Sequence, residues 1–410
     1  MRLRFHGWMV LAGICGGSAW AGDASSDPGQ AFAGVTTCAE ARQPLARHPD
    51  VAGGDAHVEA ICAAEAPQPR HEPDAQAEIR QWHRDNVAAI GQQVRGLMTL
   101  QDPRDQLAAA LLAPTYQLEG GEAAGEWTTD AATTAFAAAR RLGPDDPLVA
   151  WMEALDCPGA KAAAGCDPQA ALQRLQRLEP DNAAVWLQQL QDGLDEPEVE
   201  RILSRAAAAP GYQLPLGELG LLLYHSLDQA VVPPISPGLA AAMALDMGLA
   251  RPVGRRDMAA IHAMALTTAV ALPAYARLQH ACIAEDDVPP PARRRPACIE
   301  IYTRMAQDPL LISQTVALSS LARLTAEAPD GAHWRERLRG LHWLWPQGLE
   351  LVNAQAPADY ILTSWRDGEM AALKGVLAAA GSPLAPPHGW LPENERLRSL
   401  ITTGRPPTQD

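Results

Sequence analysis

The sequence predicts an all-α fold of stacked antiparallel helical hairpins, arranged as an α-solenoid or an α/α superhelix and stapled by local disulfides. Strand signals are sparse, because the 410 residues include three Phe and six Tyr and alternating runs of β-branched residues are hard to find. Apolar residues instead recur at helical spacing along most of the chain. Short turns rich in Pro, Gly and Asp separate these segments, and such turns join antiparallel neighbours.

The first 21 residues have the features of a secretory signal peptide. Two arginines precede the apolar run 8–14, and residues 19–21 (AWA) form the small-x-small pattern after which a signal peptidase cuts. A lipoprotein anchor at Cys15 would require a small residue before it, and none stands there. No later run approaches the ~18 apolar residues of a membrane span. We therefore expect a periplasmic or secreted protein, exported in soluble form and without a membrane span.

Cleavage after residue 21 would remove one of the seven cysteines and leave six. An even number of cysteines in an oxidising compartment predicts disulfides. The positions fall into three local pairs, so we expect Cys38–Cys62, Cys157–Cys166 and Cys282–Cys298. Each bridge would close a loop of roughly 10 to 25 residues and stabilise the fold by ~3 kcal/mol. None of the spacings is CxxC, which disfavours zinc, and we expect no metal.

The chain is acidic, with 33 basic and 48 acidic residues and a formal net charge of −15. Loss of two arginines with the signal peptide changes the balance to 31 against 48, or −17. A surface of this charge is repelled by phosphate backbones and by anionic membrane surfaces. Nucleic acid is therefore not an expected partner.

Composition divides the rest of the chain into four parts. Residues 22–70 form a cysteine-clipped N-terminal segment, and residues 71–230 form a helical, repeat-like region. A Pro-rich hinge follows at 231–238, where the sequence is VVPPISPG. Residues 239–410 form a second helical region. One continuous solenoid and two domains both fit this pattern, because consecutive helical pairs build either.

Three apolar stripes predict long helices within these regions. They consist of Ile79, Trp82, Ile90, Val94 and Leu97; of Trp334, Leu338, Leu341 and Trp345; and of Ile361, Trp365, Ala372 and Val376. Each stripe repeats at the spacing of successive helical turns. We expect Pro346 to end the second helix, because proline cannot continue the backbone hydrogen-bond ladder.

Three of the turns recur at a spacing close to that of a known helical repeat. Pro144, Pro180 and Pro210 lie 36 and 30 residues apart, on either side of the period of about 34 residues that defines a tetratricopeptide unit. Residues 178–182 match the L-x-P-x-N end of such a unit, and Trp186 stands where the aromatic residue of the next unit belongs. The segment 177–190 therefore has the sequence of a helix-turn-helix corner.

Residues 145–210 resemble the tetratricopeptide family on these features. The chain departs from the family pattern at Gln189-Leu190, where Leu-Gly is usual, and at residues 157–159, which interrupt the first helix. The resemblance implies helix-turn-helix stacking and, by analogy of fold, a concave surface that binds a protein or peptide. We place the expected groove around Trp151, Trp186 and the helix at 198–208.

Three consecutive arginines form a second candidate binding feature. Arg293, Arg294 and Arg295 follow a proline run inside the loop that the third disulfide would close. Exposed, they would bind a carboxylate or phosphate group of a partner. We favour the alternative in which they face the acidic residues 285–287 across a rigid turn.

Trp343 and Trp390 are the last candidates for a binding surface. Aromatic side chains on a concave face stack on sugars or hold a peptide. We expect Trp334, Trp345 and Trp365 to pack in the core, because they lie on the helical stripes, whereas Trp390 lies in a Pro-rich loop.

Two further groupings have the residue types of chemical sites. Glu218 and His225 lie seven residues apart on one helix face and have the types of a general base and its orienting acid. Met258 and His262 have the types of soft metal ligands. We favour ordinary structural roles for both pairs. The chain has none of the common hydrolase, nucleotide or EF-hand motifs, so we expect no catalytic residue and no cofactor.

These features favour an exported helical-repeat protein that acts as a protein- or peptide-binding scaffold of the cell envelope, without catalytic activity. One alternative is a secreted carbohydrate-active enzyme, a lyase or glycosidase, built as an α/α toroid around two carboxylates. Its sites normally use aromatic residues freely, and the aromatic content of 5% disfavours it. The other alternative is a structural envelope protein without a separable ligand.

Overall fold

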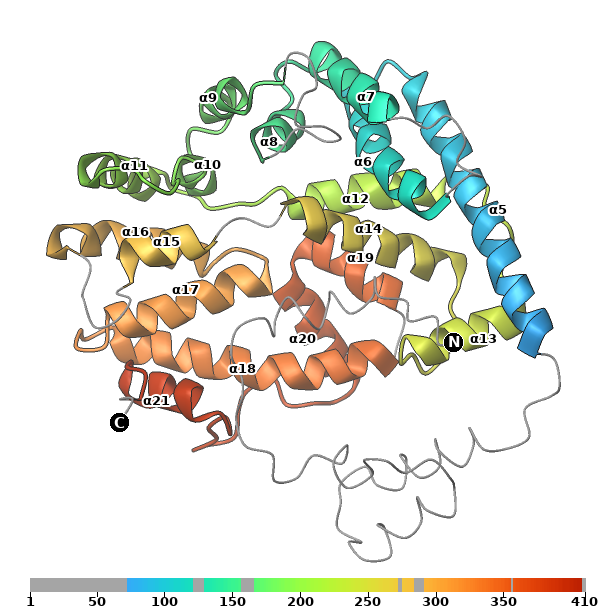
Figure 1. Ribbon diagram of the computed structural model, residues 1–410. Helices are drawn as coiled ribbons and strands as arrows, with labels where there is room; N and C mark the ends of the chain where they lie inside the picture. The colour runs from blue at the N-terminus through green and yellow to red at the C-terminus, as the bar shows by residue number, and fades with distance from the viewer. Residues whose placement is uncertain are drawn as a thin grey trace, which may run out of the picture. The chain divides into compact units, whose positions relative to one another are not determined.

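The structure, a computed structural model (Figure 1), describes residues 72–120, 129–155, 166–271, 275–283, 291–354 and 357–407. Within these ranges the regular elements are 17 α-helices and one 3-10 helix, with no β-strand, which confirms the all-α fold class. The predicted signal peptide 1–21, the segment 22–70, the acidic residues 285–287 and three of the cysteines, Cys38, Cys62 and Cys157, lie outside the described residues.

The helices have the following bounds: α5 (Glu72–Met98), α6 (Pro103–Gly120), α7 (Thr129–Leu142), α8 (Pro147–Leu155), α9 (Pro168–Leu178), α10 (Ala183–Leu187), α11 (Glu196–Ala208), α12 (Leu216–Asp228), α13 (Pro237–Asp246), α14 (Arg255–Ala271), α15 (Tyr275–Cys282), η2 (Ala292–Arg294), α16 (Arg295–Met305), α17 (Leu311–Leu324), α18 (Gly331–Ala354), α19 (Pro357–Asp367), α20 (Glu369–Ala379) and α21 (Glu395–Thr403). The chain divides into two compact units, Met1–Gln81 and Trp82–Asp410. Every contact described below lies within the second unit.

Many helices pack against the next helix along the chain. This holds for α6 with α7, α8 with α9, α10 with α11, α16 with α17 and α19 with α20. Helices from the two sides of the Pro-rich segment 231–238 also pack together, α12 with α14 and α19, and α11 with α16 (Figure 1). Both sides of that segment therefore contribute to one compact unit.

Helix α18 corrects the expectation for Pro346. The helix does not end there and continues to Ala354. Proline removes one backbone donor, the one that would have met the carbonyl of His342. The helix is held on both sides of this gap, because Leu341 and Leu344 are buried before the proline and Val352 is buried after it.

The third apolar stripe is also corrected, because it belongs to two helices. Gly368 separates α19 from α20 and adopts a φ of 94°, a left-handed conformation that only glycine takes without strain. A side chain at Gly368 would also overlap Pro309. At the end of α19 the Trp365 backbone lies against Gly217 of α12 and its ring against Gly220, but the residue is half-buried rather than in the core as expected.

The Cys282–Cys298 disulfide is confirmed, with the two Cα atoms 5.7 Å apart. It joins the end of α15 to α16, and both cysteines are buried in an apolar cluster. Tyr302 and Leu321 are among the fully buried members of that cluster. The other two predicted pairs include residues outside the described ranges and stay predictions.

Candidate functional site

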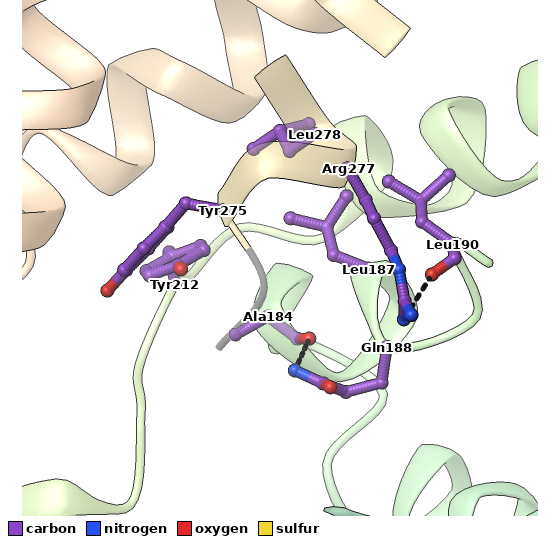
Figure 2. A pocket seen from close by; sticks show the side chains of 8 residues that line it. All are labelled: Ala184, Leu187, Gln188, Leu190, Tyr212, Tyr275, Arg277 and Leu278. Atoms are coloured by element: carbon purple, nitrogen blue, oxygen red, sulfur yellow. Dashed lines mark hydrogen bonds between the residues drawn. The ribbon is translucent and has the colours of Figure 1, made fainter. Parts of the chain in front are cut away.

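A hollow lies where α10, α15 and the residues before α12 come together (Figure 2). Its volume is about 390 Å³, counted with the solvent at its mouth. Its lining consists of Ala184, Leu187, Gln188, Leu190, Tyr212, Tyr275, Arg277 and Leu278. The hollow is thus built from side chains that lie up to 94 residues apart in the sequence (278 minus 184).

The wall on the α10 side is positioned by Asn182. Its Oδ1 accepts hydrogen bonds from the amides of Ala184 (3.1 Å) and Gln213 (3.0 Å), and its Nδ2 donates to the Gln213 carbonyl (2.8 Å). The first bond caps α10, as asparagine commonly does at a helix start. The other two fasten the turn before α10 to the segment that carries Tyr212.

The opposite wall comes from α15. Arg277 donates through Nη1 to the Leu190 carbonyl (3.2 Å), and its Nη2 lies 3.9 Å from the exposed carboxylate of Asp192. Leu278 is buried beside it. The guanidinium is therefore held at the rim with one of its five donors in a hydrogen bond to the Leu190 carbonyl.

Two tyrosines form one end of the hollow (Figure 2). The Tyr275 hydroxyl lies 2.9 Å from Ser313 Oγ of α17. The same serine also lowers the pKa of Tyr212. Burial raises the pKa of both phenols, while the hydrogen bond to Ser313 opposes that shift. Both tyrosines are therefore neutral and serve as hydrogen-bonding groups.

A buried acid lies behind these tyrosines. Asp308 is 1% exposed, and neither of its carboxyl oxygens has a partner in hydrogen-bond geometry. Burial raises its pKa to about 7; the nearby Ser313 hydroxyl and Leu310 amide oppose the shift, and the charge of Glu369 adds to it. Burial also raises the pKa of Glu369, whose carboxylate accepts a hydrogen bond from the Leu311 amide at the start of α17.

The hollow has the chemistry of a small binding site. Leucine side chains and tyrosine rings supply apolar surface, and the Gln188 amide and the Arg277 guanidinium supply polar groups at the edge. Binding pockets in proteins combine these two features, with the apolar part dominant, whereas polar atoms make up more of the exposed surface of this hollow than apolar atoms do.

Trp151, predicted to line a groove, lies in the core. Its ring is 2% exposed, and its Nε1 donates to Glu179 Oε2 (3.2 Å). Trp186 is half-buried on α10, in the same helix as Leu187 of the hollow. Its Nε1 donates to the Pro180 carbonyl (2.8 Å), and the Arg205 guanidinium lies 5.9 Å from its ring. Neither tryptophan is among the residues that line the hollow.

The three arginines have partners from elsewhere in the fold. Arg293 and Arg294 both pair with Glu196 of α11, at 2.9 Å and 3.1 Å, and Glu200 lies beside them. Arg295 donates to the Leu324 carbonyl at the end of α17. This cluster joins α11 to the start of α16.

Trp343 and Trp390 lie against each other, with ring centroids 5.1 Å apart in an edge-on arrangement. Trp343 Nε1 donates to the Pro383 carbonyl (3.1 Å). Arg339 donates to the carbonyls of Pro387 and Trp390 and so fastens the loop to α18. The tryptophan pair holds the 380–394 loop and stays a candidate surface.

The remaining groupings take structural roles in the described residues. Glu218 pairs with Arg104 at 2.7 Å, while His225 is exposed and lies beside the Tyr224 ring. Burial, with a smaller effect from His83, lowers the pKa of His262 to about 4 and keeps it uncharged. No group of three or more His, Cys, Asp or Glu that could hold a metal occurs in the described part of the chain. Within that part, no helix is long and apolar enough to span a membrane.

Sequence reasoning missed the residues that line the hollow and the acid behind it. Tyr212, Ser313 and Asp308 belong to no motif and come from different parts of the chain, and Tyr275 and Arg277 share α15. The scarcity of tyrosine was a usable signal, since two of the six meet here. No protein-family model, curated protein or solved structure matches the chain.

Proposed function

We propose that this protein is an exported, non-catalytic helical protein of the cell envelope that binds a peptide segment of a partner. The hollow between α10 and α15 takes one apolar side chain of that segment. The observation that carries the proposal is the lining itself, in which three leucines and two tyrosines surround an opening edged by Arg277 and Gln188.

The surroundings of the hollow favour a peptide over a small isolated ligand. Trp186 lies on α10, the helix that carries the lining residues Ala184 and Leu187, and the Arg205 guanidinium of α11 lies 5.9 Å from the centre of its ring. A peptide whose side chain enters the hollow would continue over these residues. Aromatic and arginine side chains are enriched where proteins bind other proteins.

Hydrogen bonds and a disulfide hold the elements that line the hollow in place. Asn182 ties the α10 turn to the Tyr212 segment, and the Cys282–Cys298 bridge ties α15 to α16. A site that is already in its binding shape loses less conformational entropy when a ligand enters.

Binding can be tested with immobilised protein and a pool of acetylated, amidated nonapeptides without titratable side chains, with mass spectrometry of the peptides retained. We expect a subset rich in Leu, Met or Phe to be retained. The variant Gln188→Trp places a large ring in the hollow and should reduce capture at least about tenfold. Gln229→Trp adds the same ring at an exposed position at the end of α12 and should leave capture unchanged. Equal capture by both variants would contradict the assignment of the site.

Export is part of the same proposal. It is supported by residues 1–21 and by the disulfide between Cys282 and Cys298, because disulfides form mainly in oxidising compartments. Sequencing of the mature N-terminus should begin at Gly22. A chain recovered from the cytoplasm with Met1 intact would contradict this part of the proposal and leave the hollow unaffected.

A further inference from the structure

Arg277 gives the hollow a charged group. Among the described residues that line it, Arg277 alone carries a charge, and its side chain is 44% exposed. Its Nη1 donates to the Leu190 carbonyl, whereas the Asp192 carboxylate lies 3.9 Å from Nη2, too far for a hydrogen bond. A guanidinium has five N–H donors. Within the described part of the chain, four of the five therefore make no direct hydrogen bond and can meet a ligand.

The two tyrosines and Arg277 lie at different ends of the hollow (Figure 2). The rings of Tyr212 and Tyr275 form one end. The Tyr275 hydroxyl points away from Arg277 and lies 2.9 Å from Ser313 Oγ. The tyrosine end therefore offers mainly ring surface, and the positive charge stands at the other end.

The arginine end of the hollow offers hydrogen-bond donors. The Gln188 amide makes one long bond, from Nε2 to the Ala184 carbonyl at 3.5 Å, and can turn to a ligand. Polar atoms make up more of the exposed surface of the hollow than apolar atoms do, and a wholly apolar ligand would leave them without partners. A carboxylate only accepts hydrogen bonds, so it complements a guanidinium and an amide N–H.

The C-terminal residue of a peptide brings the two required groups together. Its side chain and its carboxylate are both attached to one Cα, so an apolar side chain at the ring end places the carboxylate near Arg277. An acidic side chain on the neighbouring residue of an extended peptide points to the opposite face. Capture of a C-terminal carboxylate is a recurring mode of peptide recognition.

We propose that the hollow between α10 and α15 binds the free C-terminus of a partner chain that ends in an apolar residue. The α-carboxylate lies on Arg277, and the last side chain lies against Tyr212 and Tyr275. The inference rests on the proposed peptide-binding function and names the kind of segment that is bound. The chain as a whole has a formal net charge of −15 and does not attract acidic ligands from a distance, so direct contact with the guanidinium provides the selectivity.

Three N-terminally labelled peptides of Gly, Ser and a final Leu test the assignment at pH 7, where a C-terminal carboxyl group is ionised. The first has a free carboxylate, and the second has a C-terminal amide. The third also ends in an amide but carries Asp before its Leu, so its charge equals that of the first. Fluorescence polarisation measures the three Kd values. We expect the first peptide to bind about tenfold more tightly than either of the others, the effect of one charge-assisted hydrogen bond.

Three variants assign this preference to Arg277. Arg277→Gln should weaken binding of the free acid to the level of the amide and leave the amide unchanged, which also shows that the hollow is intact. Arg141→Gln removes the same charge at an exposed position on α7 and should retain the tenfold preference. Asp192→Asn removes a 93% exposed carboxylate beside Arg277 and should tighten binding of the free acid about twofold.

The outcomes separate this proposal from the proposed function. Equal binding of the free acid and the amide, both weakened by Gln188→Trp, would overturn the proposal and leave the hollow as a peptide site. A preference for the free acid that persists in Arg277→Gln would also overturn it. Tight binding of the Asp peptide would show that an acidic side chain reaches Arg277 equally well, against the C-terminal assignment. If none of the three peptides binds, the peptide-binding function fails and the C-terminal assignment fails with it.

Discussion

The carboxyl groups of Glu153 and Asp308 are equally buried, at 1% exposure, and are accommodated in opposite ways. Glu153 on α8 lies between Arg140 of α7 and Arg174 of α9, so its charge is paired on both sides. Asp308 has no cation beside it and is surrounded by hydroxyl groups and a second acid. Paired charges hold three helices together, whereas an unpaired acid can change its protonation at physiological pH.

Different kinds of link fasten the two regions. The region of Glu153 is joined by ion pairs among α7, α8 and α9. The region of the hollow is joined by a disulfide between α15 and α16 and by the side chain of Asn182. The second kind of link stays in place whatever the charge of the acid behind the hollow.

The largest expected effect is at the paired site. Glu153→Gln removes the negative charge between two partly buried arginines, and we expect a loss of about 3 to 5 kcal/mol in the free energy of unfolding. Urea denaturation followed by circular dichroism measures it. Glu350→Gln, at an exposed position on α18, is the control and should change stability by less than about 0.5 kcal/mol. A loss as small as that of the control would show that the arginines do not depend on Glu153.

The disulfide should have the next largest effect. The double variant Cys282→Ala, Cys298→Ala removes a bridge across a separation of 16 residues, and we expect a loss of about 3 kcal/mol. A double variant as stable as the parent would mean that packing around α15 suffices.

The smallest effect is a gain, expected at Asp308. Its pKa of about 7 lies above the ordinary 3.8. Burial of Asp308 therefore leaves the free energy of unfolding unchanged below about pH 4 and lowers it increasingly between about pH 4 and pH 7. Above about pH 7 the reduction stays constant. Asp308→Asn removes the charge and should raise the free energy of unfolding at pH 8 by about 2 kcal/mol. This is part of the roughly 4 kcal/mol that the raised pKa of Asp308 implies. At pH 4 the variant should gain nothing.

The measurement for Asp308 is the difference in unfolding free energy between the variant and the parent across pH 4 to 8. Other groups titrate in both proteins and cancel in the difference. A difference that does not grow with pH would mean that Asp308 is already charged or solvated in the folded protein.

Several elements could be predicted because their causes are local. The stripe Ile90, Val94 and Leu97 forms the buried face of α5, and Asn182 caps α10 as its residue type and position indicate. Helix α9 ends at Leu178, where the following Glu-Pro-Asp-Asn turn predicts its end. Residues within one turn of each other determine all of these features.

Other features were missed because distant residues determine them. Trp186 was placed on a full repeat helix, but α10 has five residues and the chain turns at Gln188. Arg293 pairs with Glu196, 97 residues away in the sequence, which no local pattern indicated, while its expected partners 285–287 lie outside the described residues. Sequence spacing contains no information about such partners.

The sequence by itself determined the helical fold class, the turn between α9 and α10 with its Asn182 cap, and the Cys282–Cys298 pair, since periodicity, capping and short loop closure act over a few residues to a few tens of residues. Only the tertiary structure decided the site. Tyr212, Tyr275 and Asp308 come from separate elements, and they meet because α11 packs on α16 and α16 on α17. Burial then sets the protonation of Asp308, and burial is a property of the packed chain rather than of any segment.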